Sequence, residues 1–249
     1  MLTKQNIKYI QSLQYKKFRD EHNAFVAEGP KVIAELLDDG SFNCLALYAL
    51  PEWIEKIDNN HVNALGDRLI AIKSFELEKI AYYSTPNAAV AVFEKKTPAK
   101  VSAIRGQITL LLDNIQDPGN MGTIIRTADW FGIKHIVCSE NTVDIYNNKV
   151  VQSTMASLGR VEVSYTSLFE WLKEHQDAKK IAAVLEGNLL SKANFSEDET
   201  LIVMIGNESN GLSDQLIELA DEKMTIPSFG QAESLNAAIA AAIFMYALK

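Results

Sequence analysis

The chain has 249 residues, with 24 Lys and Arg against 32 Asp and Glu, a formal net charge of −8, and 47% hydrophobic residues. This composition is typical of a globular protein with enough apolar material for one large domain or two modest ones. Because no apolar run reaches ~18 residues and the amino terminus lacks an apolar signal core, we predict no membrane-spanning helix and a cytoplasmic location.

Residues 1–93 have the pattern of a small α/β module. Apolar residues recur at helical spacing between residues 2 and 19, which predicts one helix there. Gly29-Pro30 is predicted to open a helix that ends at Gly40. Further helices are predicted at residues 51–58 and 75–82, and strands at residues 24–27, 45–50, 69–72 and 88–93. Residues 94–106 contain several lysines without apolar periodicity and are predicted to be a linker.

Residues 107–249 alternate between strand and helix patterns more regularly. Strands are predicted at residues 108–112, 135–138, 161–164, 180–184, 201–205 and 223–226. Helices are predicted at residues 123–131, 148–157, 167–175, 213–220 and 236–248. This alternation is typical of an α/β domain with a mostly parallel sheet covered by helices.

The acidic net charge is unusual for a protein that binds nucleic acid, but the basic residues are clustered. Residues 1–19 and 95–112 contain no acid, and they hold the basic residues Lys4, Lys8, Lys16, Lys17 and Arg19, then Lys95, Lys96, Lys100 and Arg105. Two interpretations stay open at this point. In the first, the lysines are solvent-exposed residues of a helix and a linker without a binding role. In the second, they form basic patches that attract the phosphate groups of a nucleic acid.

Cysteine and histidine usage argues against a metal site. Cys44 and Cys138 are far apart in the sequence, and we predict two reduced thiols, each in or beside a strand. The four His residues have no spacing typical of metal ligands. The glycine fingerprints of dinucleotide- and ATP-binding loops are also absent from the sequence, so a ligand with little phosphate is favoured.

Three turns with small or polar residues at their tips follow or join apolar runs, at residues 117–129, 205–213 and 226–236. In α/β sheets such turns at the carboxyl ends of strands are where ligands bind. Each residue taken alone also fits a purely structural role. Asn120, Ser234 and Asn236 could be helix caps or turn residues, and Arg126 could form an exposed ion pair with Asp129. The occurrence of all these residues in this order is stronger evidence for a functional site than any one of them.

Together the turns resemble motifs 1, 2 and 3 of the SpoU/TrmH family of RNA ribose 2′-O-methyltransferases. The matching residues are Asn120, Gly122 and Arg126 in motif 1, Gly206, Asn207, Glu208, Gly211, Leu212 and Ser213 in motif 2, and Ile226, Pro227, Ser234, Leu235 and Asn236 in motif 3. Ser209 and Ala156 depart from the pattern, each where a glycine is common. Residues 25–33 are similar to the start of an RNA substrate-binding domain of some members, which resembles small ribosomal proteins.

The resemblance implies three parts, an RNA substrate-binding domain over residues 1–93, a linker over 94–106 and a methyltransferase domain over 107–249. It further implies a trefoil knot, S-adenosylmethionine as the cofactor, a homodimer, and no metal or membrane partner. The implied catalytic residues are Asn120, Arg126, Glu208, Ser234 and Asn236. The implied cofactor contacts are Gly206, Asn207, Gly211, Ile226 and Leu235.

The implied substrate is structured RNA, and the additional amino-terminal domain favours ribosomal RNA. Methylation of transfer RNA is the alternative, as is a non-catalytic RNA-binding protein on the same scaffold. A small-molecule enzyme would leave the basic segments unexplained. Within the family Arg126 is the activating residue. Because a guanidinium stays charged, with a pKa above ~12, we expect it to clamp a phosphate and stabilise the developing 2′-oxyanion.

Overall fold

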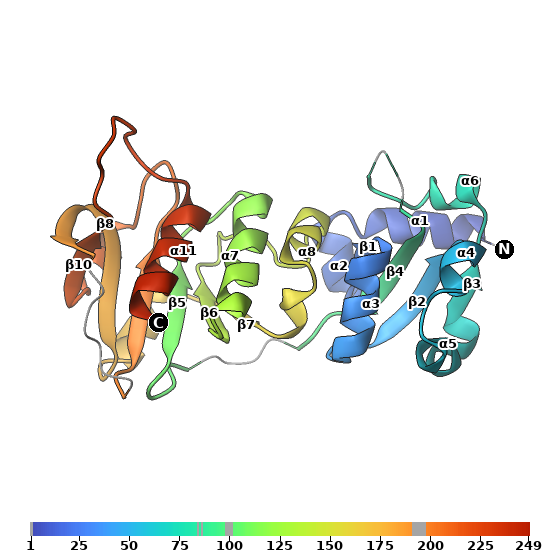
Figure 1. The fold of residues 1–249 in the computed structure, drawn as a ribbon, viewed down its shortest axis with the longest axis horizontal. Helices are drawn as coiled ribbons and strands as arrows, with labels where there is room; N and C mark the ends of the chain where they lie inside the picture. Colours follow the sequence, from blue (N-terminus) through green and yellow to red (C-terminus); the bar gives the residue numbers. More distant parts are fainter. Residues whose placement is uncertain (1, 84, 86, 98–101, 191–197) are drawn as a thin grey trace. The chain divides into compact units, whose positions relative to one another are not determined.

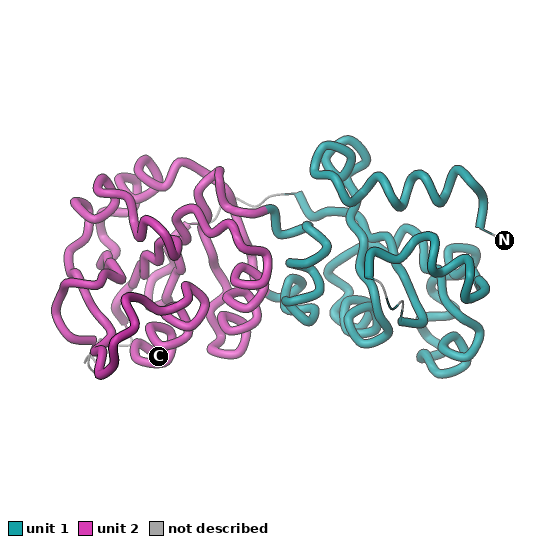
Figure 2. Tube along the Cα trace, turned by 90° about the horizontal axis from the view of Figure 1, so that it is seen from above, with its two compact units in different colours: residues 1–97, 144–160 teal, residues 98–143, 161–249 magenta. Residues whose placement is uncertain are grey.

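The computed structural model describes residues 2–83, 85, 87–97, 102–190 and 198–249. The chain forms two compact units, which are coloured separately in Figure 2. Unit 1 comprises residues 1–97 together with residues 144–160, and unit 2 comprises residues 98–143 and 161–249. The sequence does not indicate that residues 144–160 belong with the amino-terminal unit. The predicted linker lies partly outside the described residues.

Unit 1 is built on a mixed sheet in the order β1-β4-β2-β3. β4 pairs antiparallel with both β1 and β2, and β2 pairs parallel with β3. Its elements are α1 (Lys4–Ser12), α2 (Lys16–His22), β1 (Ala24–Glu28), α3 (Pro30–Asp39), β2 (Cys44–Ala49), α4 (Pro51–Ile54), α5 (Asn59–Leu65), the 3-10 turn η1 (Gly66–Arg68), β3 (Leu69–Ala71), α6 (Ser74–Leu77), β4 (Ala89–Glu94), α8 (Asn148–Thr154) and the 3-10 turn η2 (Ser157–Gly159). The predicted small α/β module is confirmed, and α3 ends at Gly40 as predicted.

The predicted single helix over residues 2–19 is wrong, because the chain leaves the helix after Ser12 and re-enters it at Lys16. Leu13 is buried and Tyr15 has an extended backbone. The carbonyl oxygens of Leu13 and Gln14 accept hydrogen bonds from Arg19 Nη1, at 3.0 and 2.8 Å. The guanidinium therefore satisfies carbonyls that a continuous helix would have bonded to its own N–H groups.

The other differences in unit 1 concern the lengths of short helices. α4 and α6 end at Ile54 and Leu77, earlier than predicted. The additional helix α5 begins after Asp58, whose side chain accepts a hydrogen bond from the N–H of Asn60. An N-cap of this kind is a strong start signal that the apolar spacing did not reveal.

Residues 144–160 contact the rest of unit 1 through, among others, an ion pair and an aromatic contact. Arg19 donates to Asp144 Oδ2 from Nε at 3.0 Å and from Nη2 at 2.7 Å. The ring of Tyr146 lies 4.8 Å from that of Phe25, between ring centroids. The backbone N–H of Lys96 donates to the Tyr146 hydroxyl at 3.1 Å. This segment, which connects two strands of unit 2, is thus part of the core of unit 1.

Unit 2 contains an all-parallel sheet with the strand order β10-β8-β9-β5-β6-β7 (Figure 1). Its elements are β5 (Ile108–Leu112), α7 (Pro118–Trp130), β6 (His135–Cys138), β7 (Glu162–Tyr165), α9 (Leu168–Glu174), β8 (Lys179–Leu189), β9 (Leu201–Ile205), α10 (Asp214–Glu218), β10 (Glu222–Thr225) and α11 (Ala237–Leu248). The predicted parallel α/β arrangement is confirmed. Both cysteines are free and buried in strands, Cys44 in β2 and Cys138 in β6, as predicted.

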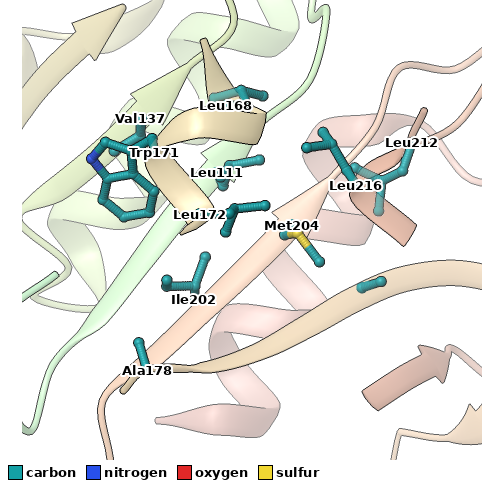
Figure 3. Packing of buried hydrophobic residues seen from close by; sticks show 11 residues of the cluster. Leu111, Val137, Leu168, Trp171, Leu172, Ala178, Ile202, Met204, Leu212 and Leu216 are labelled. Carbon is teal, nitrogen blue, oxygen red and sulfur yellow. The ribbon is translucent and has the colours of Figure 1, made fainter. Parts of the chain in front are cut away.

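One face of this sheet forms a hydrophobic core with α9 and α10 (Figure 3). Leu111 and Met204 extend from neighbouring strands toward Trp171 and Leu172 of α9 and Leu216 of α10. Helices α7 and α11 lie next to each other, as Figure 1 shows. The buried strands β5 and β9 therefore form the centre of the sheet, and two of the three predicted turns emerge from their carboxyl ends.

Strand β8 is longer than predicted and is irregular where it pairs with β10. Lys223 pairs with Ala182, whereas the next residue, Met224, pairs with Asn188. Gly187 lies in this excursion, and a Cβ there would be 2.6 Å from the carbonyl oxygen of Lys223, so only glycine fits. The displaced residues 183–185 line the cavity described below.

Candidate active site

The predicted turns meet at the carboxyl ends of β5, β9 and β10. The turn after β5 is joined to the turn after β9, because Asp113 Oδ2 accepts a hydrogen bond from the N–H of Ser213 at 3.0 Å. The turn after β10 runs to Asn236, the N-cap of α11. The position agrees with the rule that open parallel sheets bind ligands at this edge.

The turn after β9 is closed by its own hydrogen bonds. Asn207 and Gly211 form an antiparallel bridge, with backbone N···O distances of 3.3 and 3.0 Å. The side-chain Oδ1 of Asn207 accepts from the N–H groups of Ser209 at 3.0 Å and Asn210 at 2.7 Å. Gly211 has φ +66°, whereas Gly206 is required for space, since a Cβ there would lie 2.0 Å from the carbonyl carbon of Gly211. The turn is therefore a preformed loop.

A side-chain network joins three of the predicted catalytic residues. Asn120 Nδ2 donates to Glu208 Oε1, and Asn236 Nδ2 donates to Asn120 Oδ1 at 2.8 Å. The Oδ1 atom of Asn236 accepts from the N–H of Ala238 at 2.9 Å, which fixes the amide orientation at the start of α11. The side-chain amide of Asn120 thus connects three turns that are distant in the sequence.

Asn120 lies in the first turn of α7, which begins five residues earlier than the predicted helix. Asp117 is the N-cap and accepts from the N–H of Asn120 at 2.8 Å, and Pro118 occupies the first helical position. Asp followed by Pro is a helix-start signal, so the sequence carried this information. Asp117 and Asp113, which hold the turns in place, were not among the predicted site residues.

The structure does not bring Arg126 or Ser234 into this network. Arg126 is exposed on α7, six residues beyond Asn120, which corresponds to about 9 Å along the helix axis. Among the described residues, Arg126 forms no hydrogen bond with Asn120, Glu208 or Asn236. Ser234 is exposed and lines the neighbouring cavity. Both side chains are therefore accessible to solvent.

A cavity of about 650 Å³ lies between the turns after β9 and β10 and the irregular part of β8. Its apolar wall comes from several elements, including Leu185 of β8, Ile205 of β9 and Phe244 of α11. The five residues predicted to contact a cofactor all line it, namely Gly206, Asn207, Gly211, Ile226 and Leu235. This volume lies within the ~300–1,000 Å³ typical of pockets for small ligands.

The charges around the cavity indicate the kind of ligand that fits. Its described lining includes the carboxylates of Glu208 and Glu233 and contains no Lys or Arg. A phosphate would find no cationic partner there, whereas a cationic group near the carboxylates of Glu208 and Glu233 would be favoured. The residues therefore fit S-adenosylmethionine, which combines an apolar adenosine portion with a sulfonium and an ammonium group.

The described residues give no support for a metal site, a membrane-spanning helix or a cysteine nucleophile. No group of three or more His, Cys, Asp and Glu side chains there could hold a metal ion. Within the same residues, no helix is long and apolar enough to cross a membrane. Cys138 is fully buried at the end of β6, and burial raises the pKa of its thiol, so this group is not a nucleophile.

Comparisons with known proteins agree with the geometry. The SpoU rRNA Methylase family matches residues 107–246, and the MRM3-like substrate binding domain matches residues 4–91. The chain is 29% identical over 255 residues to the 23S rRNA (guanosine(2553)-2′-O)-methyltransferase RlmP of Bacillus subtilis, covering 98% of this chain and 96% of that protein.

Two solved structures are similar over nearly the whole chain. One, assigned to the TrmH family of RNA methyltransferases, is from Porphyromonas gingivalis, with a TM-score of 0.86 and 33% identity over 99% of this chain and 98% of that one. The other is an rRNA methyltransferase from Sinorhizobium meliloti with bound AdoMet, with a TM-score of 0.85 and 29% identity over 99% and 95%.

The family match spans more than half of the chain and includes all three motif turns, and the amino-terminal match spans most of unit 1. The chain belongs to the SpoU rRNA methylase family and carries an MRM3-like substrate-binding domain.

Proposed function

We propose that this protein transfers the methyl group of S-adenosylmethionine to a ribose 2′-hydroxyl of ribosomal RNA. The observation that carries the proposal is the network in which Asn120 joins Glu208 and Asn236 beside a cavity without basic residues. The similarity to RlmP, a methyltransferase of 23S rRNA, supports ribosomal RNA as the substrate. Methylation of transfer RNA is the alternative that the assay below distinguishes.

The proposed cofactor site uses the two preformed turns. The apolar side chains of Ile226 and Leu235 would hold the adenosine portion, and the backbone of Gly206, Asn207 and Gly211 would border it. When bound, S-adenosylmethionine supplies a methyl group on a sulfonium, an electrophile that the protein does not have to create.

The remaining task of the protein is to orient the ribose. The Asn120 amide fixes Glu208 and Asn236, whose oxygen and nitrogen atoms can then position the ribose hydroxyls without reorganisation. Ser234 adds an exposed hydroxyl at the cavity. Arg126 would clamp a phosphate next to the target ribose and stabilise negative charge that develops on its 2′-oxygen.

Substitution of Arg126 tests this role. Because Lys retains the charge but not the planar fork, Arg126→Lys should lower kcat/KM for RNA by ~10²-fold, which is typical of losing one electrostatic donor. Binding of S-adenosylmethionine, measured by calorimetry, should be unchanged. An Arg126→Lys enzyme with near-normal turnover would exclude the clamp.

The reaction itself is tested with methyl-labelled S-adenosylmethionine and total RNA from a strain that lacks the gene. A labelled 2′-O-methylated nucleoside in the ribosomal fraction is the expected result. Label in transfer RNA alone would replace the proposed substrate. Absence of label together with absence of cofactor binding would instead favour a non-catalytic RNA-binding protein.

We also propose the finer properties that the resemblance implies. Residues 1–93 bind the RNA substrate, residues 94–106 are a linker, and residues 107–249 form the methyltransferase domain. The trefoil knot within residues 107–249 stays a prediction. We propose a cytoplasmic location because ribosomal RNA is the proposed substrate. The transfer should need no metal ion, so activity should persist in excess chelator.

We propose a homodimer formed through the exposed faces of α7 and α11. Trp130 of α7 is 84% exposed, and Ile239 and Tyr246 of α11 are also exposed, although large apolar side chains gain free energy from burial. Several such residues on neighbouring helices are typical of an interaction surface. Light scattering should give twice the chain mass of 27.7 kDa. A monomer at micromolar concentration would contradict the proposal.

A further inference from the structure

The loop between β10 and α11 carries an aromatic side chain that is not part of the hydrophobic core and is not among the residues predicted to contact the cofactor. Phe229 is 97% exposed, the largest value among the exposed large apolar residues of the described chain. Its neighbours Ser228, Gly230 and Gln231 are exposed as well. A phenyl ring held in water forgoes the favourable burial that most aromatic side chains obtain. The ring is therefore available to a partner from outside the chain.

The position of Phe229 relates it to the proposed reaction. It is one of the residues that line the cavity, and the same loop supplies Ile226 and Leu235 to the cavity wall and Asn236 to the hydrogen-bonded network. Gly230, the next residue, has open space beside it, since a Cβ there would meet no atom within 4 Å. The Phe229 ring itself is 97% exposed, so a flat group has room to stack on it.

The charges at this edge of the cavity favour a base over a phosphate as the partner. Glu208 and Glu233 lie along the same cavity, whose described lining contains no Lys or Arg. Stacking of a base on an aromatic ring does not require a cation, and proteins recognise unpaired RNA bases in this way.

We propose that Phe229 is a stacking platform for an unpaired base of the RNA substrate, at or next to the methylated nucleotide. The inference rests on the proposed function, because it assumes that RNA enters at the cavity. Phe229 is then a positioning residue. It holds the base, and the attached ribose is thereby presented to Asn120, Glu208 and Asn236. The substrate must expose at least one unstacked base at the modified position.

The test compares Phe229→Ala, Phe229→Leu and Phe229→Trp in the full-length protein, with ribosomal RNA from the gene-deleted strain. Stacking on one aromatic residue is worth ~1–3 kcal/mol, so Phe229→Ala should raise the KM for RNA roughly 5- to 150-fold. Phe229→Trp should stay within about 3-fold of the parent protein, because indole also stacks. Phe229→Leu should resemble Phe229→Ala, since leucine is apolar but has no ring face.

The controls separate stacking from a general loss of apolar surface and from a damaged cofactor site. Leu189→Ala removes another exposed apolar side chain of unit 2, outside the cavity lining, and should leave the KM for RNA unchanged. S-adenosylmethionine affinity should change less than 2-fold in all variants. Fluorescence of Phe229→Trp should be quenched by RNA more than that of the parent protein.

Several results would overturn the inference. Phe229→Leu with parental KM would show that only apolar contact matters. Loss of cofactor affinity with unchanged KM for RNA would make Phe229 a cover for the cofactor, and dissociation of a dimer would make it a contact with a second copy. If the parent protein neither binds nor methylates RNA, the proposed function fails first and takes this inference with it.

Discussion

The buried pair Arg19–Asp144 should be the most sensitive polar contact of unit 1. It joins α2 to residues 144–160, and its side chains are 3% and 12% exposed. Arg19 donates two hydrogen bonds to Asp144 and one each to the carbonyl oxygens of Leu13 and Gln14. The Arg19→Met variant would therefore leave a carboxylate and two carbonyl groups without these donors.

The expected loss follows from this geometry. Removing one member of a buried ion pair typically costs ~3–5 kcal/mol, because the remaining charge is buried without a partner. This is a large part of the ~5–15 kcal/mol by which most domains are stable. Lys16→Met is the matched control, since Lys16 pairs with Asp20 at 2.9 Å with side chains 67% and 45% exposed. Exposed pairs contribute only ~0.2–1 kcal/mol.

Hydrogen exchange read by mass spectrometry is the suitable assay, because a chain of two units need not unfold in one transition. Peptides from residues 13–19 and 144–160 should lose protection in Arg19→Met, while those of β5 and β9 should not. The double variant Arg19→Met with Asp144→Leu should recover part of the loss, since no charge is then left unpaired. A loss below ~1 kcal/mol in Arg19→Met would refute the reasoning and show that water screens the pair.

Two further predictions concern single positions. Gly206→Ala places a Cβ 2.0 Å from the carbonyl carbon of Gly211, so the loop must shift, and we expect a loss of ~1–3 kcal/mol in the free energy of unfolding. Cofactor binding, measured by calorimetry, should be more than 10-fold weaker. The control Gly230→Ala, whose Cβ would meet no atom within 4 Å, should retain the stability of the parent protein. Burial raises the pKa of Glu28 from its ordinary value of 4.5, so its stabilising effect is complete below the unfolded-state pKa and is lost as pH rises through the folded-state pKa. As pH rises above 4.5, the free energy of unfolding should therefore fall less in Glu28→Gln than in the parent protein. Urea unfolding at several pH values measures this, and an equal pH dependence in the two proteins would contradict it.

The features that follow from the sequence are local ones. Gly40 ends α3 in the left-handed conformation, and Asn236 caps α11, because each requires only its immediate neighbours. The central strands β5 and β9 are buried at every residue and almost entirely apolar, so their parallel pairing could also be predicted. The helix start at Asp117 is also a local signal, but the apolar periodicity of α7 begins only later, so periodicity alone places the start at residue 123.

The remaining features depend on contacts between distant residues. Nothing near Tyr146 indicates that its ring lies against Phe25, and the break after α1 depends on Arg19 reaching back to Leu13. The irregular pairing of β8 is equally non-local, because it is decided by the backbone of Lys223. The candidate site residues can be identified from the order of the three motifs in the sequence. Which of them are in contact, such as Asn120 with Glu208 and Asn236, is visible only in the fold.

The basic residues near the amino terminus differ in how far they are available to bind RNA phosphates. Of the basic residues in the first helical segment, Arg19 is buried in an ion pair and Lys16 pairs with Asp20, whereas Lys4 and Lys8 are exposed on α1. If Lys4 and Lys8 contact phosphates, replacing both with Gln should reduce the slope of log K against log salt by about 1.4–1.8, at ~0.7–0.9 per contact. Lys16→Gln, the matched control, should change the slope by less than about 0.5, because its charge is already paired. Filter binding over a range of salt concentrations measures both. An equal reduction in Lys16→Gln would mean that net charge, rather than a defined face of α1, attracts the RNA.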